Sequence, residues 1–322
     1  MLRVRSLSTL PGNFDAFQEE VAAILERLYG AKSAGEYRQN ARRAMAANLA
    51  HPQVRALALL DGKTTAGITI AMLREGFAEI FFVHLLKAYQ GRGFETRLLR
   101  DTLAMLHAEN VRGILCECVI PEGMDIGTTL ITGGLHPVPR QLMVADLDAA
   151  PMHAPVLLPV RPLAPTDSGS VAHCIVEAYR AQDAPPLHLE VQSLPNALDF
   201  LGRLQQGAYG PVKPGFQQVL YSGDRCAGAV LGCEVAPDTG FVLQLVVAPE
   251  FQGRGYAKAL LHALATVYRE AGYRRMALGV TCDNPALRLY EKLGFRVIQP
   301  VTAYVWWQAG MNRGLASAAG PP

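Results

Sequence analysis

The chain has 322 residues, more than one typical domain, so we expect two packed cores. Half of the residues are hydrophobic and 18% are charged, a balance that excludes a largely disordered chain. The formal net charge is only +2 at pH 7, so composition offers no electrostatic case for binding nucleic acid or an anionic membrane.

The first half predicts a strand, a glycine turn, a helix and a second strand. An apolar run from Ile80 precedes the sequence QGRG at residues 90–93, an amphipathic run follows it, and another apolar run begins at Gly113. The same order recurs in the second half, where an apolar run from Phe241 precedes QGRG at residues 252–255. The two halves are therefore expected to be copies of one α/β unit.

A proline-rich connection separates the two copies. Residues 148–168 contain five prolines around a short apolar run, and proline at this density interrupts helices and marks a linker. We therefore predict one domain at residues 1–150 and a second at 151–309. Residues 310–322 are small, polar and end in proline, which predicts a flexible tail.

The second half has enough predicted elements for one compact domain. Residues 222–224, Ser-Gly-Asp, lie between two apolar runs and predict a tight hairpin turn. Strands and helices that alternate around such a hairpin predict a mixed sheet covered by helices. The expected strands are 156–161, 217–222, 226–235, 240–248, 274–281 and 295–307, and the expected helices are 168–180, 193–205, 255–271 and 285–292.

The segment around the second QGRG is suited to bind a phosphate. A buried strand ends at Val247, Pro249 cannot continue the ladder, and glycines come directly before a helix. The first turn of a helix presents unpaired N–H groups and a positive dipole end, and Arg254 and Lys258 add positive charge. Neither GxGxxG nor GxxxxGK[ST] is present, so a diphosphate is expected in another kind of site.

Gln252, Gly255 and Ala257 match the Q/R-x-x-G-x-G/A signature of the GNAT acetyltransferases, and the segment ALRLYEKLGF follows at the family's distance. The second half resembles that family over residues 156–307. The resemblance implies an α/β (α+β) architecture of two tandem GNAT folds, each a mixed, mostly antiparallel sheet flanked by helices. The tandem layout is similar to that of the mycothiol synthases, in which the C-terminal half is the working one.

The resemblance also implies the chemistry and the residues that perform it. Acetyl-CoA would be the cosubstrate, an amine would attack its thioester directly without a metal, and Tyr290 would protonate the departing thiolate. The family's usual asparagine spacing lands on Asp283, with Asn284 next to it. The CoA contacts implied by the resemblance are Leu245, Val246, Val247, Gln252, Gly253, Arg254, Gly255, Tyr256, Ala257, Lys258 and Asn284.

The general base has no obvious counterpart in this sequence. Many family members carry a glutamate on the strand before the last helix, and its place here is Gly279. Another base, a water chain or an amine that arrives neutral would have to replace it. Glu234, on a neighbouring strand, and His188 and Glu190, in the loop between the first two helices, are the candidates, although each is more often a solvated surface group.

The first copy departs from the signature and is expected to be a degenerate, noncatalytic GNAT domain. Glu95 stands where the second copy has Ala257, and a carboxylate there would repel a diphosphate. Leu130 occupies the place of the tyrosine. Glu117 occupies the place of the base, but a base without the proton donor is incomplete. Weak CoA binding is left open because Arg92 and the glycines remain.

Two functions from different classes are consistent with these residues. The favoured one is an N-acetyltransferase whose acceptor is a small-molecule or peptide amine. The alternative is a non-catalytic CoA-binding sensor or scaffold. Polyamines, aminoglycosides, amino sugars, peptide termini and protein lysines all stay open, because the loops at 181–195 and 205–216 carry no motif.

The cysteines and the hydropathy predict a cytoplasmic protein. None of the six cysteines has the C-x-x-C spacing of zinc sites, so free thiols and no metal are expected. No apolar run is long enough to span a bilayer, and the N-terminus lacks the apolar block of a signal peptide. A homodimer is left open.

Overall fold

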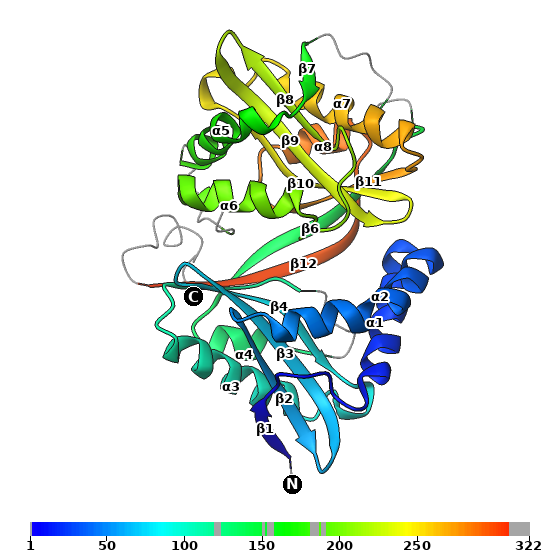
Figure 1. The fold of residues 1–322 in the computed structure, drawn as a ribbon, viewed down its shortest axis with the longest axis vertical. Coiled ribbons are helices and arrows are strands. Elements are labelled where there is room, and N and C mark those ends of the chain that lie inside the picture. Colours follow the sequence, from blue (N-terminus) through cyan, green and yellow to red (C-terminus); the bar gives the residue numbers. More distant parts are fainter. Residues whose placement is uncertain are drawn as a thin grey trace. The chain divides into compact units, whose positions relative to one another are not determined.

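The computed structural model describes residues 2–118, 124–149, 152, 158–180, 187 and 191–308 (Figure 1). The chain forms two compact units. Among the described residues, unit 1 comprises those up to Pro139 together with those from Val301 onward, and unit 2 comprises Arg140–Pro300. No helix in these ranges is both long and apolar enough to cross a membrane.

Unit 1 contains a twisted sheet with strand order β1-β2-β3-β4-β5. The strands pair antiparallel except β4 and β5, which are parallel. Its elements are β1 (Arg3–Ser6), α1 (Phe14–Tyr29), α2 (Ala31–Ala50), β2 (Val54–Asp61), β3 (Thr64–Arg74), β4 (Phe77–Leu85), η1 (Lys87–Tyr89), α3 (Phe94–Ala108), β5 (Gly113–Cys116) and α4 (Gly127–Thr132).

Unit 2 repeats this plan with strand order β6-β11-β10-β9-β8-β7. Again one pair, β10 and β11, is parallel. Its elements are β7 (Val160–Pro162), η3 (Pro165–Asp167), α5 (Ser168–Arg180), α6 (Leu194–Gln205), β8 (Gln217–Ser222), β9 (Arg225–Ala236), β10 (Thr239–Val247), η5 (Pro249–Phe251), α7 (Tyr256–Glu270), β11 (Arg275–Thr281) and α8 (Leu287–Lys292). Two further strands belong partly to each unit: β6 (His136–Asp146) begins in unit 1, and β12 (Arg296–Trp307) ends there.

The predicted mixed sheet and each predicted element of the second half are confirmed, with shifts at the ends. The hairpin is confirmed as well, because Ser222 pairs with Arg225 and Gly223 has φ 60°. The last helix begins at Leu287 rather than at residue 285. The first strand runs from Val160 to Pro162, and residues 156–157 of the predicted run lie outside the described residues.

The compact units do not coincide with the predicted division at residue 150, because the last strand of each copy pairs outside its own half of the sequence. Residues from Arg140 onward in β6 pair antiparallel with β11, from Arg140↔Thr281 to Asp146↔Arg275. Conversely, Tyr304–Trp307 at the end of β12 belong to unit 1 and pair antiparallel with β5 there. Alternation of apolar residues predicts such strands but cannot name their partners.

The sheet of unit 2 has an apolar cluster on each face. On the face that we call the α7 face, Leu260 and Leu264 of α7 pack with Leu278 of β11. On the opposite face, the α5 face, Ile175 of α5 packs with Phe200 of α6. Because side chains alternate along a strand, each residue of β10 and β11 is directed to one of these faces.

A buried carboxylate holds the start of α5. Asp167 is 5% exposed and accepts hydrogen bonds from the Arg161 guanidinium at 2.7 and 2.9 Å, the Ala164 amide at 2.7 Å and the Tyr221 hydroxyl at 2.9 Å. Arg161 is the main reason that the pKa of Asp167 lies well below its usual range. Since α5 carries Tyr179 at its other end, this contact helps to position the site described below.

We expect Asp167→Asn to lower the free energy of unfolding by about 1–3 kcal/mol at pH 7, because the amide keeps only one acceptor oxygen. A depressed folded-state pKa stabilises the fold above the unfolded-state pKa of about 3.9, and that contribution is lost as the pH falls. Denaturant titrations at several pH values check both points. Asp199→Asn, at a carboxylate that is 53% exposed, is the control; equal losses for the two variants would contradict the assignment.

Candidate functional site

The parallel pairing between β10 and β11 stops partway along both strands. The paired residues run from Thr239↔Arg275 to Val242↔Leu278, whereas β10 continues to Val247 and β11 to Thr281. The register of β10 with β9 also shifts between Val242 and Gln244. The two strands separate beyond this point, and a cavity of about 830 Å³ lies between them.

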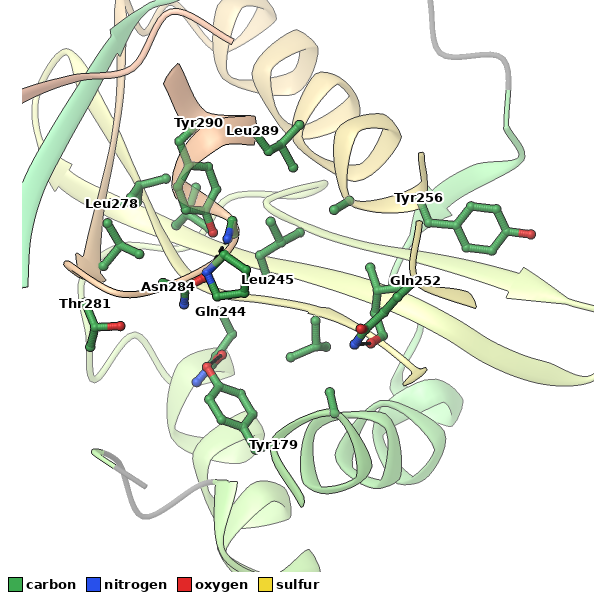
Figure 2. Close-up of a pocket in the computed structure, with 18 of the residues that line it drawn as sticks. Tyr179, Gln244, Leu245, Gln252, Tyr256, Leu278, Thr281, Asn284, Leu289 and Tyr290 are labelled. Carbon is green, nitrogen blue, oxygen red and sulfur yellow. Dashed lines mark hydrogen bonds between the residues drawn. The ribbon is translucent and has the colours of Figure 1, made fainter. Parts of the chain in front are cut away.

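The cavity is lined from both faces of the sheet. Leu289 and Tyr290 of α8 lie on one side of Leu245, and Gln244 and Tyr179 lie on the other (Figure 2). Every CoA-contact residue expected from the sequence lines it except Arg254, whose guanidinium carbon lies 5.6 Å from the centre of the Phe251 ring. The residues brought together are Leu245, Val246, Val247, Gln252, Gly253, Gly255, Tyr256, Ala257, Lys258, Asn284 and Tyr290.

The second QGRG forms a left-handed turn at one end of the cavity. Gly253 and Gly255 have φ of 74° and 82°, which side chains with a Cβ rarely adopt. No heavy atom lies within 4 Å of a Cβ built on either residue, so the backbone angle is what requires glycine. The Gln252 side-chain amide donates to the Val247 carbonyl at 3.1 Å and closes the turn. Gln252 therefore stabilises the turn.

The N-terminus of α7 leaves amides available at this turn. Gly255 is the N-cap residue without a side-chain cap, and the first helical hydrogen bond runs from the Ala259 amide to the Gly255 carbonyl at 3.0 Å. The amides of Tyr256, Ala257 and Lys258 precede that bond, so they have no partner within the helix. Together with the helix dipole and the exposed Lys258 side chain, they form a site suited to an anion.

Tyr290 is buried, at 8% exposure, and its ring contacts Phe295 edge-on. Its hydroxyl points toward the centre of the cavity (Figure 2). Burial, and secondarily the nearby Tyr179, raise the pKa of Tyr290 well above the ordinary value for tyrosine. The phenol is therefore protonated throughout the neutral range and can donate a proton.

Asn284 organises the loop before α8. Its side-chain oxygen accepts from the Ala286 amide at 2.8 Å, and its own amide donates to the Thr281 carbonyl at 3.1 Å. The oxygen is thus engaged in an Asx-type turn. A contact from Asn284 to a ligand in the cavity would have to use the side-chain NH₂ group.

Polar groups on the α5 face were not predicted from the sequence. The Tyr179 hydroxyl donates to the Gln244 side-chain oxygen at 3.0 Å, and Gln244 is only 3% exposed. Arg140, in β6, also lines the cavity, and its terminal nitrogen lies 3.1 Å from where a Cβ on Gly279 would be. The glycine at position 279 indicated in the sequence that another group could occupy the space of its missing side chain. No local pattern, however, identifies Arg140 as that group.

Of the three candidates for a general base, the structure describes only Glu234. Glu234 does not line the cavity, because its carboxylate accepts from the Tyr273 hydroxyl and lies 3.5 Å from the Lys213 ammonium. His188 and Glu190 lie outside the described residues. Among the cavity-lining residues that the structure describes, the carboxylate is that of the exposed Asp283.

Unit 1 has the same turn, but the strand end beside it differs. The Gln90 side chain donates to the Leu85 carbonyl at 2.6 Å, and Gly93 has φ 74°, as in unit 2. The Leu85 amide, however, donates to the Met124 sulfur at 3.5 Å, so a backbone group in the position of Val247 is already engaged. Glu95 is 6% exposed in the first turn of α3, which adds a negative charge where unit 2 offers amides.

We therefore expect a single acetyl-CoA site per chain. Leu130 of unit 1, fully buried in α4 where unit 2 has Tyr290, offers no hydroxyl. Calorimetric titration should give a stoichiometry near one, and Met124→Ala should leave it unchanged because Glu95 still repels the diphosphate. A second site of comparable affinity would show that unit 1 is not degenerate.

The second half of the chain is similar in sequence to known acetyltransferases, and the whole chain is similar to them in fold. Residues 189–295 match the sequence model of the acetyltransferase (GNAT) family. The [ribosomal protein bS18]-alanine N-acetyltransferase of Haemophilus influenzae is 33% identical over 66 residues, which cover 20% of this chain and 45% of that protein. The chain thus matches less than half the length of this curated relative.

Two solved structures share the fold along almost the entire chain. A GCN5-related N-acetyltransferase from Sphaerobacter thermophilus superposes with a TM-score of 0.67 at 20% identity and 95% coverage of both chains. A tandem GNAT protein from the clavulanic acid biosynthesis pathway superposes with a TM-score of 0.62 at 17% identity, over 95% of this chain and 98% of that one. The likeness to the mycothiol synthases stays a prediction. Residues 189–295 thus match the GNAT acetyltransferase family, and the chain as a whole has the fold of these GNAT structures.

Proposed function

We propose that unit 2 is an N-acetyltransferase that moves the acetyl group of acetyl-CoA to an amine. The observation that carries the proposal is the cavity between β10 and β11, because it joins a glycine turn with available amides to the hydroxyl of a buried tyrosine. An anion site and a proton donor at two ends of one cavity are what a CoA thioester requires.

The residues fit CoA in three places. The amides of Tyr256, Ala257 and Lys258 would hold the diphosphate, with the positive end of α7 behind them. The edge of β10 from Leu245 to Val247, which β11 leaves unpaired, would take the amide-containing pantetheine arm as an added strand. Leu289 contributes apolar surface to the same cavity.

The chain's own groups support direct transfer. The acceptor nitrogen attacks the thioester carbonyl, the C–S bond breaks, and the Tyr290 phenol gives its proton to the departing thiolate. The amine loses a proton on forming the amide, and that proton reprotonates Tyr290 through solvent. The amine attacks in its neutral form, and one that arrives neutral needs no base from the chain.

Calorimetry and thiol release together test the proposal. The purified protein should bind acetyl-CoA, and free CoA thiol should appear with at least one member of a panel of amino acids, polyamines, aminoglycosides, amino sugars, peptides with a free terminus and lysine-containing proteins. The curated relative acetylates an alanine of a ribosomal protein, which makes alanine-terminated peptides a necessary part of the panel. Absence of acetyl-CoA binding would overturn the proposal.

A CoA-binding sensor without turnover is the second candidate, and the arginine over Gly279 favours it because a cation stands where a base would be expected. Such a protein would bind acetyl-CoA yet release no thiol with any amine.

A cytoplasmic location and a homodimer stay predictions.

A further inference from the structure

The cavity has a direction, which is set by the groups that would hold acetyl-CoA. The amides of residues 256–258 lie at the turn, and β10 and β11 meet at the other end, where Val242 pairs with Leu278. We call this second end the closed end. The Tyr290 hydroxyl lies between the two, with Gln252 of the turn on one side of it and Leu278 on the other (Figure 2). A thioester held by its diphosphate at the turn, with its sulfur at Tyr290, therefore directs its acyl chain toward the closed end.

On the α7 face, the closed end is walled by buried apolar side chains. Val242 and Leu278 are 5% and 2% exposed, and both belong to the apolar cluster of that face together with Val280. All three residues line the cavity. Because side chains in such a cluster are close-packed, they limit how far an acyl chain extends on this face.

On the α5 face, the closed end is covered by Arg140. Leu278 and Val280 are directed to the α7 face, so Gly279 between them is directed to the α5 face by the alternation of a strand. A Cβ built on Gly279 would lie 3.1 Å from a terminal nitrogen of Arg140 and 3.9 Å from its guanidinium carbon. Arg140 lines the cavity, and its Nε atom is buried. The guanidinium thus occupies the space beside the first residue of β11 beyond the last pair with β10.

We propose that Arg140 is the end wall of the acyl subsite and that it restricts the donor to acetyl-CoA, against thioesters of longer acyl chains. This inference rests on the proposed acetyltransferase function, because it assumes that an acyl-CoA occupies the cavity. The role is steric: it depends on where the guanidinium lies and not on its charge, so it is compatible with the contacts that Arg140 makes within the protein. One methylene group more or less in a shaped pocket changes recognition by about 10- to 200-fold.

The first test is the affinity for a series of acyl-CoAs, measured by calorimetry without any amine. The probes are acetyl-CoA, propionyl-CoA and butyryl-CoA. We expect the wild-type protein to bind butyryl-CoA at least about 10-fold more weakly than acetyl-CoA, because the added methylene groups have to displace the guanidinium. Equal affinity for the three thioesters would overturn the proposal.

Arg140→Ala removes the wall and leaves β11 unchanged. We expect this variant to bind butyryl-CoA about 10-fold more tightly than the wild type does, with the Kd for acetyl-CoA within about threefold of the wild-type value. Arg288→Ala, at an exposed arginine of α8 outside the cavity lining, is the matched control and should leave the ratio of the two Kd values unchanged.

Gly279→Ala should change the preference in the opposite direction. It adds a methyl group at the same place, and the neighbouring Arg140 is a long side chain whose end can shift by a few tenths of an ångström. The closed end then becomes narrower, so propionyl-CoA should lose affinity relative to acetyl-CoA. Thermal unfolding shows whether each variant is folded. If Arg140→Ala is not, Arg140→Gln, which also removes the guanidinium, takes its place in the comparison.

The outcomes separate this proposal from the proposed function. If Arg140→Ala, or Arg140→Gln in its place, kept the wild-type order of affinities, the role of Arg140 would be overturned and the acetyltransferase would stand. If no amine released thiol, the transferase would be overturned, while the Kd series would still decide whether Arg140 limits the acyl chain. A protein that bound none of the three thioesters would overturn both.

Discussion

Replacing Tyr290 by Phe is expected to lower kcat by about 10²–10³-fold while the Kd for acetyl-CoA stays within about twofold, because the change removes the proton donor and keeps the ring. The ring packs against Phe295 in a buried setting, so the shape of the cavity wall is preserved. Steady-state thiol release and calorimetry of the same preparations make the comparison.

The pH dependence adds a second criterion. Because burial raises the pKa of Tyr290, the phenol stays protonated beyond the ordinary tyrosine range, and kcat should not decline on the alkaline side below pH about 10. Tyr209→Phe is the control, since that ring packs against Phe200 and does not line the cavity. A Tyr290→Phe enzyme with native kcat, or with kcat lowered no more than in the control, would remove the assignment.

Ala257→Glu should strongly weaken the binding of acetyl-CoA. Ala257 lies in the first turn of α7 and lines the cavity, so a glutamate there meets the expected diphosphate. Two like charges about 4 Å apart at an effective dielectric constant near 20 repel by about 4 kcal/mol, and with partial screening a loss of about 100-fold in affinity is expected. Calorimetry with acetyl-CoA measures it.

The matched variant is Ala257→Gln, which adds the same volume without charge and should cost much less affinity. Stability should move the other way, because an acidic residue in the first turn of a helix is favourable by about 0.3–1 kcal/mol. Unit 1 already holds the natural counterpart, the buried Glu95 in the first turn of α3. Equal loss of affinity in both variants would show that bulk, not charge, closes the site.

Local features made much of unit 2 predictable. Glycines with positive φ, a proline after a strand and an amphipathic run together specify the turn at residues 252–255, and each acts over a few residues. The hairpin at Gly223 follows from the same kind of reasoning. The repeat of QGRG predicted two related units, and residues 189–295 in the second of them match the GNAT family.

The exchange of strands could not be predicted in this way. The alternation of apolar and polar residues along a strand indicates which side chains share a face. It does not indicate the neighbouring strand, which can be far away in the sequence, as in the pairing of Arg140 with Thr281. The same holds for Met124, whose sulfur accepts a hydrogen bond from the Leu85 amide. These contacts depend on how the segments pack, and no local pattern contains that information.

By itself, the sequence determined the elements of unit 2, the glycine turn and the tyrosine placed after it, because backbone angles, periodicity and short-range spacing are local properties. The tertiary structure alone decided that β10 and β11 separate into a cavity, that Glu234 is held away from it by Tyr273, and that Arg140 covers Gly279. Those outcomes depend on registers and distances between residues remote in sequence, which only the folded chain brings together.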